Sequence, residues 1–446
     1  MLRNSRIFTM SSRIETNTVT LQSYCALLNY ARLIAVIIAC ICMSVRATTF
    51  IAPINLLEPW NVLIKPDLHG CKPYLFALYA EGGFGTVGYN RHGCKVNALQ
   101  IWNPEQNVLK MLTGFGASNP ISQKSMQVDA TDDGTRGHVV PCGNLQVDFA
   151  GAFSAYFKVG HCWMFSAHVP FLRMALTDVS YTDLTQDNTA EDLRVKELLT
   201  DNLAQVICQL GDGLDIGSWR RTGVADGVFI AHWMNDFPQK KPFLKNVNIT
   251  FRVGTTVPFG QKEDEDLLVA FPFGNDRAGA VFGGFGLTLT LGNTLRVGAD
   301  IQLDHTFGSI RTRRIKTDVE QTELFLLEKI ASYKDNGLTQ EFNLFGECFD
   351  LIPGFSFLLG YEYLKHSDDV LSIFSNAFSS SVATNAQKLF DWTLHQIVVR
   401  FGFDSTCWCG EQATVIPSGA LYMRLPFNGR RSIGLSMIGG YFALKF

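Results

Sequence analysis

Apolar and polar residues alternate strictly in this chain over segments of about ten residues. In segment 247–257, Val247, Ile249 and Phe251 fall on one face of a strand and polar side chains fall on the other. Segment 294–304 repeats the pattern. Strands of soluble β-sandwiches have roughly five or six residues, whereas a strand that crosses a bilayer needs about ten. The alternation therefore favours membrane-crossing strands, with a soluble β-rich protein as the alternative.

The composition agrees with strands that have two different faces. Hydrophobic residues make up 47% of the chain and charged residues 18%, against roughly 25% charged residues in soluble domains. No stretch beyond residue 50 approaches the ~20 consecutive apolar residues of a membrane helix. The 34 Phe and 39 Gly residues suit the aromatic girdles and crowded strands of a barrel. The net charge of −3 gives no basic stripe for a nucleic acid.

The N-terminal part of the chain has the build of a secretory signal peptide. Arg32 precedes an apolar run over 33–45, which is short for a membrane helix, and small residues lead to a cleavage site after Ala47. We expect residues 1–47 to be the signal peptide; an uncleaved anchor and a lipoprotein site at Cys40 are the alternatives. Residues 48–72 hold three prolines and read as an irregular segment, either periplasmic or a plug. Residues 73–446 are the expected barrel.

The links between the predicted strands fall into two length classes. If the C-terminus lies in the periplasm, the links on that side are mostly short (160–161, 292–293 and 351–353), and those outside are long (178–221, 258–277, 305–339 and 367–391). Short periplasmic turns and long outer loops are typical of outer-membrane barrels. Loop 405–416 and a tight Asn428-Gly429 turn are exceptions. The sequence thus predicts an all-β, antiparallel transmembrane β-barrel of about 12 strands, or about 14, with a short helix over 190–210 in one external loop.

The last strand ends in an aromatic residue. Five residues alternate along one face up to the terminus: Ile438, Gly440, Phe442, Leu444 and Phe446. This strand resembles the terminal assembly signal of Gram-negative outer-membrane β-barrel proteins. The resemblance is to the porin-like class rather than to one family, and it covers the architecture of most of the mature chain. It implies an outer-membrane location, contact with the barrel-assembly machinery, and a lipid and lipopolysaccharide environment.

The alternation also predicts which charged side chains face the lumen. A cation on the lipid face at the bilayer midplane costs about 2–4 kcal/mol, so charged residues of the strands should point inward. We expect the following residues to line a pore: Arg252, Arg296, Asp300, Asp304, Glu362, Arg400 and Arg424. Charged residues around a pore set its ion selectivity; salt bridges that fill a closed lumen are the alternative.

Two charged runs lie in predicted outer loops. Residues 263–266 are four adjacent carboxylates, which could hold a divalent cation but more often form a solvated loop. Arg311, Arg313, Arg314 and Lys316 form a basic run in the next loop, suited either to lipopolysaccharide or to solvent. No metal site or cofactor is predicted from either run.

Cysteine is frequent for a protein of this class. The chain has 11 cysteines, and in an oxidising compartment they could form disulfides. We expect Cys71 to pair with Cys94. Cys407 and Cys409 are too close in sequence to bridge each other easily and could pair elsewhere or across chains.

The sequence supports three functional hypotheses. The first is a porin-like channel for the passive diffusion of small polar solutes. The second is a transporter of hydrophobic compounds plugged by residues 50–72 and part of 100–140, and the third is a structural or adhesive surface protein linked by disulfides, in which a homo-oligomer would fit. No nucleophile motif of a hydrolase occurs, so we expect a protein that is not an enzyme.

Overall fold

The computed structural model describes residues 52–68, 72–128, 131, 133–410 and 413–446. These residues belong to one compact unit. The predicted signal peptide, residues 1–47, lies outside the described residues. No helix among the described residues is both long enough and apolar enough to cross a membrane.

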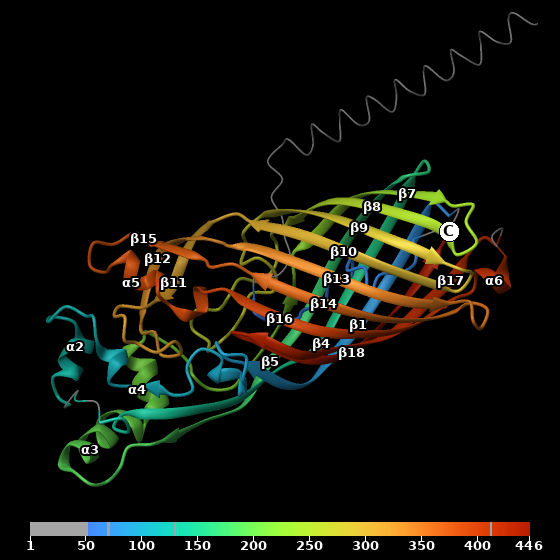
Figure 1. Ribbon diagram of the computed structural model, residues 1–446. Coiled ribbons are helices and arrows are strands. Elements are labelled where there is room, and N and C mark those ends of the chain that lie inside the picture. Colours follow the sequence, from blue (N-terminus) through green and yellow to red (C-terminus); the bar gives the residue numbers. More distant parts are fainter. Residues whose placement is uncertain (1–51, 69–71, 129–130, 132, 411–412) are drawn as a thin grey trace, which may run out of the picture. The chain divides into compact units, whose positions relative to one another are not determined.

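Twelve antiparallel strands close into a barrel (Figure 1). Its strands are β1 (Tyr74–Tyr89), β4 (His138–Val159), β5 (Trp163–Asp183), β7 (Gly227–Pro238), β8 (Leu244–Val257), β9 (Ala280–Leu291), β10 (Leu295–Thr306), β13 (Leu338–Phe349), β14 (Phe355–His366), β16 (Trp392–Asp404), β17 (Ile416–Arg430) and β18 (Ser432–Lys445). The prediction of a 12-stranded antiparallel barrel is confirmed.

Strand β1 closes the barrel, because it pairs with β18 on one side and with β4 on the other. Leu75 lies opposite Lys445 of β18 and opposite Tyr156 of β4. Closure leaves none of the twelve strands as an unpaired edge, which a membrane requires since lipid cannot satisfy backbone N–H and C=O groups.

The two ends of the barrel differ in the length of their connections. At the end that holds the C-terminus, called the turn end, the links are short, apart from the link between β16 and β17, which carries the short helix α6 (Thr406–Cys409). Gly160 and Gly292 take φ values of 64° and 60° in two of these turns, a conformation that glycine adopts at little cost. The opposite end, called the loop end, carries the long connections, as predicted from the sequence.

The loop end carries a structured region beyond the barrel. Its strands are β2 (Lys95–Val96), β3 (Gln106–Asn107), β6 (Trp219–Val224), β11 (Ser309–Ile315), β12 (Glu328–Asp335) and β15 (Val370–Ile373). Its helices and helical turns are η1 (Ala98–Gln100), η2 (Lys110–Leu112), α2 (Pro120–Ser125), α3 (Ala190–Val195), η3 (Lys196–Thr200), α4 (Leu203–Leu210), α5 (Ser380–Thr384) and η4 (Gln387–Leu389). Strands β11, β12 and β15 form a separate sheet.

The predicted helix over 190–210 is present but broken. Thr189 begins α3 with a capping box to Asp192, a π-helical turn follows, and α4 ends at Gly211. Leu199 and Ile207 are fully buried, because the apolar residues recur with helical spacing along one face.

The predicted position of the turn at Asn428-Gly429 is wrong. Asn428 lies opposite His395 in the ladder between β16 and β17, and β17 continues to Arg430. The chain reverses at Arg431, which has a φ of 46° and whose guanidinium donates to Asp391 at 3.0 Å. Pairing with β16 therefore overrides the local turn preference of Asn-Gly.

Candidate functional site: a plugged lumen between two cavities

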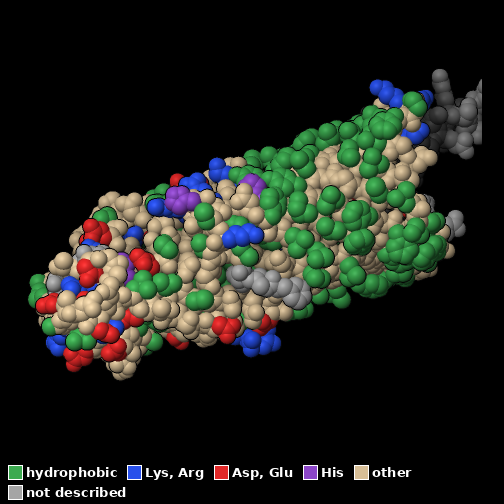
Figure 2. Space-filling model, turned by 60° about the horizontal axis from the view of Figure 1, so that its bottom comes forward, with side chains coloured by type: hydrophobic (Ala, Val, Ile, Leu, Met, Phe, Trp, Pro, Cys, Tyr) green, Lys and Arg blue, Asp and Glu red, His purple; other side chains and the backbone are tan. Residues whose placement is uncertain are grey.

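The outer face of the barrel is apolar. Exposed side chains on it include Phe76, Leu78, Phe153, Phe229, Phe251, Val253, Leu359, Phe401, Leu421 and Phe442. Figure 2 shows hydrophobic side chains over the barrel, whereas charged ones gather at the loop end. Monomeric soluble proteins rarely expose apolar patches above a few hundred Å², and a closed sheet with such a belt suits lipid. The protein is an outer-membrane β-barrel. Its long loops are then extracellular and its turn end is periplasmic.

Comparisons with known proteins give distant likenesses only. No protein-family model matches the chain, and no curated protein matches it. An outer membrane channel from Pseudomonas putida F1 is 12% identical, with 86% of this chain and 100% of that one covered at a TM-score of 0.46. The NanC porin is 7% identical, and the match covers 69% of this chain and 98% of the porin with a TM-score of 0.29. A Pseudomonas aeruginosa FadL homologue is 9% identical, and the match covers 89% of this chain and 98% of the homologue with a TM-score of 0.29. The assignment to a β-barrel rests on the strand pairing.

Arg252 and Asp300, both predicted to line a pore, form a buried ion pair inside the barrel. The guanidinium donates two hydrogen bonds of 2.6 Å to the carboxylate, and the side chains are 1% and 3% exposed. Arg252 stands on β8 and Asp300 on β10, with β9 between them. Gly284 of β9 makes the contact feasible, because a Cβ there would lie 2.7 Å from Arg252 Nε.

The other residues predicted to line a pore also face the lumen. Most of them contact another side chain of the protein rather than an open channel. Glu362 accepts from Gln396 at 2.6 Å, and Asp304 accepts from Gln302 at 3.1 Å. Arg424 forms an ion pair with Glu81, whose strand, β1, was not predicted to contribute a charge. Arg400 donates to Glu347 at 2.8 Å, and Arg296, which is partly exposed near the periplasmic mouth, lies 3.4 Å from the same carboxylate.

Residues 52–68 run through the lumen and are called the plug. Asn61 donates to Glu341 at 2.9 Å and to Glu362 at 3.1 Å, so it joins two strands. Trp60 is buried, and its ring lies 5.5 Å from that of His168 on β5. The sequence left open whether this segment was periplasmic or inside the barrel, because three prolines mark it as irregular but say nothing of its location.

Further contacts hold the plug at each end. Near the extracellular end, Ile54 pairs with Ile433 of β18 through a parallel bridge, and the Asn55 side chain bonds the backbone of Leu435 at 2.8 Å in both directions. Near the periplasmic end, Arg296 donates to Asp67 at 3.3 Å. The plug therefore spans the lumen from one mouth to the other.

A cavity lies on each side of the plug. The periplasmic cavity has a volume of about 460 Å³ and is lined by Asp67, Arg296, Glu347 and Arg400 among others. The extracellular cavity has a volume of about 130 Å³ and is lined by Ala52 at the start of the plug. A third space of about 20 Å³ lies against the plug at Glu58 and Asn61 and is large enough for about one water molecule.

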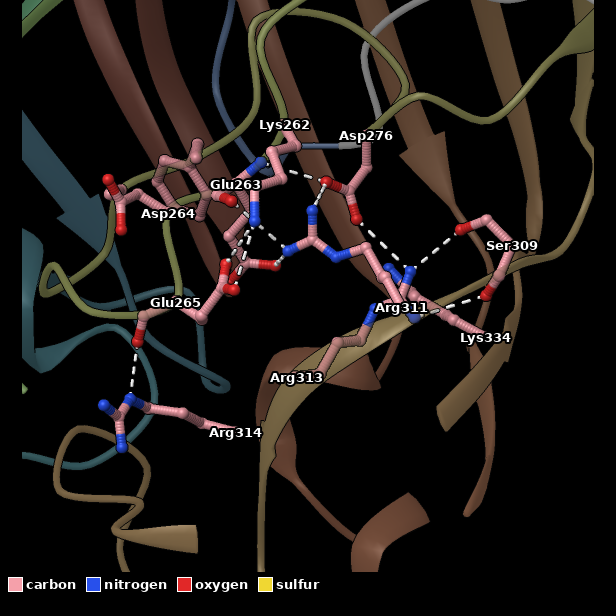
Figure 3. Close-up of polar contacts among 12 residues, drawn as sticks. Lys262, Glu263, Asp264, Glu265, Asp276, Ser309, Arg311, Arg313, Arg314 and Lys334 are labelled. Atoms are coloured by element: carbon pink, nitrogen blue, oxygen red, sulfur yellow. Dashed lines mark hydrogen bonds and ion pairs between the residues drawn. The ribbon is translucent and has the colours of Figure 1, made fainter. Parts of the chain in front are cut away.

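The extracellular cavity has an apolar floor and a charged wall. Leu267, Phe271, Leu324, Leu389 and Trp392 supply apolar surface. The acidic run 263–266 and the basic run 311–316, which the sequence placed in separate loops, interlock beside it (Figure 3). Their two loops are thereby joined over the barrel mouth, so the acidic run is not simply the solvated loop that the sequence favoured.

The interlock is a set of ion pairs centred on Asp276. Arg311 pairs with Asp276 and lies 3.3 Å from Glu263, while Arg313 lies 3.3 Å from Asp276 (Figure 3). Arg314 donates to Asp266 at 2.7 Å. The basic run is thus turned toward carboxylates of this chain, and its contact with lipopolysaccharide stays a prediction.

The pKa values of the carboxyl groups in this charged wall depend on their burial and on the cations beside them. Burial alone would raise the pKa of Glu263, but the surrounding cations, Lys388 first, hold it below its usual range. Burial likewise opposes ionisation of Asp369, yet Lys334 and His366 keep its pKa well below the ordinary value. Both carboxylates are therefore charged at neutral pH.

Asp226 fastens the loop that carries the acidic run. Its carboxylate accepts backbone N–H groups of Gly260 at 2.8 Å and Asn275 at 2.7 Å. Burial raises the pKa of Asp226 to about 6, although these hydrogen bonds act against the rise. No sequence pattern singled out this residue, because it falls within segment 222–234, which the sequence predicts as a single strand.

The predicted assembly signal lies on the lipid-facing side of β18. Ile438, Phe442 and Phe446 are exposed, and Gly440 and Leu444 are partly buried. The Phe446 ring packs edge-on against Phe76 of β1, with centroids 5.9 Å apart, at the seam where the barrel closes. Recognition of this strand by the assembly machinery stays a prediction.

The cysteine prediction falls partly outside the described residues. Cys71 lies outside them, and Cys94 is an exposed free thiol after β1. Cys142, Cys162, Cys208, Cys348, Cys407 and Cys409 are also free thiols. The described residues contain no group of three or more His, Cys, Asp or Glu side chains placed to hold a metal ion.

Proposed function

We propose that this protein is a plugged outer-membrane channel that takes up small, largely apolar molecules. The observation that carries the proposal is the plug itself, which occupies the lumen of a barrel already narrow at 12 strands. An aqueous channel is surest at about 16–18 strands. Passive diffusion of polar solutes, the first hypothesis from the sequence, would require the plug to leave the lumen.

The apolar floor of the extracellular cavity supports the same function. Ligand sites are concave and mostly apolar, with a few fixed polar groups, and this cavity opens against the start of the plug. Val269, which lines it, has a φ of 52°. A β-branched residue in that conformation is strained, and such strain clusters at ligand-binding sites.

Two measurements on the full barrel test the proposal. In proteoliposomes, arabinose should cause little swelling, because the plug blocks a water-filled path. In lipid nanodiscs, isothermal titration calorimetry should detect saturable binding of benzamide, a small neutral probe with an apolar ring.

A pair of variants locates the binding. Leu267→Gln, in the cavity floor, should weaken benzamide binding about tenfold, the equivalent of about 1.4 kcal/mol. Leu193→Gln, on an exposed helical surface of the same region, should leave it unchanged. Rapid swelling in arabinose together with no benzamide binding would instead establish the diffusion channel.

A further inference from the structure

The extracellular cavity is lined by two arginines and two lysines. They are Arg313, Arg314, Lys334 and Lys388. A cation that lines a cavity either forms an ion pair within the protein or is available to a ligand. We therefore compare the carboxylate partners of the four cations.

Three of these cations are engaged by carboxylates of the chain. Arg313 lies 3.3 Å from Asp276, and Arg314 lies 2.7 Å from Asp266. Lys334 lies 2.7 Å from Asp369, whose other oxygen accepts from His366 at 2.9 Å. These groups hold the loops together.

Lys388 differs from the other three. Its ammonium donates to the carbonyl oxygen of Arg314 at 3.3 Å, and no carboxylate of a described residue lies within 4.0 Å of it. An ammonium has three N–H donors, so this single hydrogen bond leaves donors that a ligand in the cavity can engage. Burial lowers the pKa of Lys388, while Glu263 acts in the opposite direction.

Most of the carboxylates that line the cavity are held by cations of the chain. Glu263 and Asp276 are held by Arg311, and Asp369 by Lys334. The remaining pairs join Glu265 to Lys262 and Glu323 to Lys316, both at 3.1 Å. Asp264 also lines the cavity, where its carboxylate accepts the backbone N–H of Asp266 at 3.2 Å, and no cation of a described residue lies within 4.0 Å of it. Among the described residues, Lys388 and Asp264 are therefore the lining charges without a short-range ion pair.

Lys388 also stands beside the apolar floor. It is followed directly by Leu389 in the turn η4, and both line the cavity with Trp392 and Phe271. A ligand that places an anionic group on the ammonium would thus bring an attached apolar body against these side chains.

We propose that the extracellular cavity binds small amphipathic monoanions, with a carboxylate or sulfonate paired to Lys388 and an apolar body on Leu389, Phe271 and Trp392. This inference rests on the proposed function, because it names the class of molecule taken up at the same cavity. A charge-assisted hydrogen bond in a partly desolvated site is stronger than a neutral one, so Lys388 selects for the anion.

Three isosteric probes test the charge preference in nanodiscs: benzoate, neutral benzamide and cationic benzamidine. Calorimetry should show benzoate binding at least tenfold more tightly than benzamide and than benzamidine, whereas tighter binding of benzamidine would show that Asp264 sets the preference and would overturn the proposal. In Lys388→Gln, which keeps a donor for the Arg314 carbonyl, benzoate should fall to the affinity of benzamide. Benzamide itself should bind as before.

The matched variant is Lys95→Gln, an exposed lysine of the same extracellular region. It should keep the wild-type preference for benzoate. If all three probes bind alike, or Lys388→Gln keeps the preference, the anion proposal is overturned while the apolar cavity stands. If none of the probes binds, the proposed function fails and the anion site fails with it.

Discussion

At the scale of single residues, the alternation of the strands predicted the direction of the lumen charges but not their partners. Arg252 belongs inside because its neighbours in sequence are lipid-facing, and a pattern of period two contains that information. Its partner Asp300 lies two strands away and is reached over Gly284 of the intervening strand. Contacts of this kind depend on register and on the space between strands, and neither is written in a local pattern.

Loss of Arg252 should destabilise the barrel strongly. Arg252→Leu leaves Asp300 buried without its ion-pair partner, and breaking a buried pair from one side costs about 3–5 kcal/mol. The free energy of unfolding in urea, followed by tryptophan fluorescence in lipid vesicles, measures the effect. The double variant Arg252→Leu with Asp300→Leu should recover most of the loss; a single variant as stable as the wild type would show that the pair contributes nothing.

Asp369 should make the extracellular mouth sensitive to acid. Its pKa lies well below the ordinary Asp value because the effects of Lys334 and His366 exceed that of burial. A lowered folded-state pKa gives stability that is present above about pH 4 and lost as the pH falls further. Because the backbone N–H of Gly337 donates to Asp369 at 2.8 Å, its hydrogen exchange reports the loss.

In Asp369→Asn, exchange at Gly337 should be faster than in the wild type at pH 7, and the difference should shrink as the pH falls from about 4 toward the lowered pKa of the wild-type carboxylate. Equal exchange in the two proteins at pH 7 would mean that the carboxylate does not hold this turn.

At the scale of elements, the strands were predictable and the elements without a strong period were not. Strands such as β8 and β10 have one lipid face and one lumen face, so their pattern is unambiguous. The plug has no period, since it is surrounded by protein and its prolines prevent regular structure. Only the contacts of Asn55, Trp60 and Asn61 reveal that it lies inside the barrel.

Fixing the plug to the wall should stop transport. Ile54 and Ile433 lie side by side in a backbone bridge, so cysteines at both positions should come within disulfide distance. In proteoliposomes, the oxidised double variant should lose uptake of benzenesulfonate, a permanent anion that crosses bare bilayers poorly, and reduction should restore it. Each single-cysteine variant should behave as the wild type under both conditions, whereas undiminished uptake through the oxidised variant would mean that solute passes without movement of the plug.

At the scale of the whole molecule, the loop parity predicted the orientation of the barrel, and the strand count of 12 followed from it. The extracellular region was not predictable to the same degree. It is held by pairs such as Arg314 with Asp266 and Lys110 with Glu320, which join loops far apart in the chain. The sequence contained both charged runs, but it did not specify that one would neutralise the other.

The plug is the feature on which the functional account depends, and planar-bilayer conductance tests it most directly. The barrel with residues 52–68 intact should show little current, because those residues block the lumen. A variant lacking residues 52–68, first checked for a folded barrel by heat-modifiable gel mobility, should show stepwise ohmic conductance. Steady ohmic conductance of the intact protein, equal to that of the deletion variant, would contradict the account.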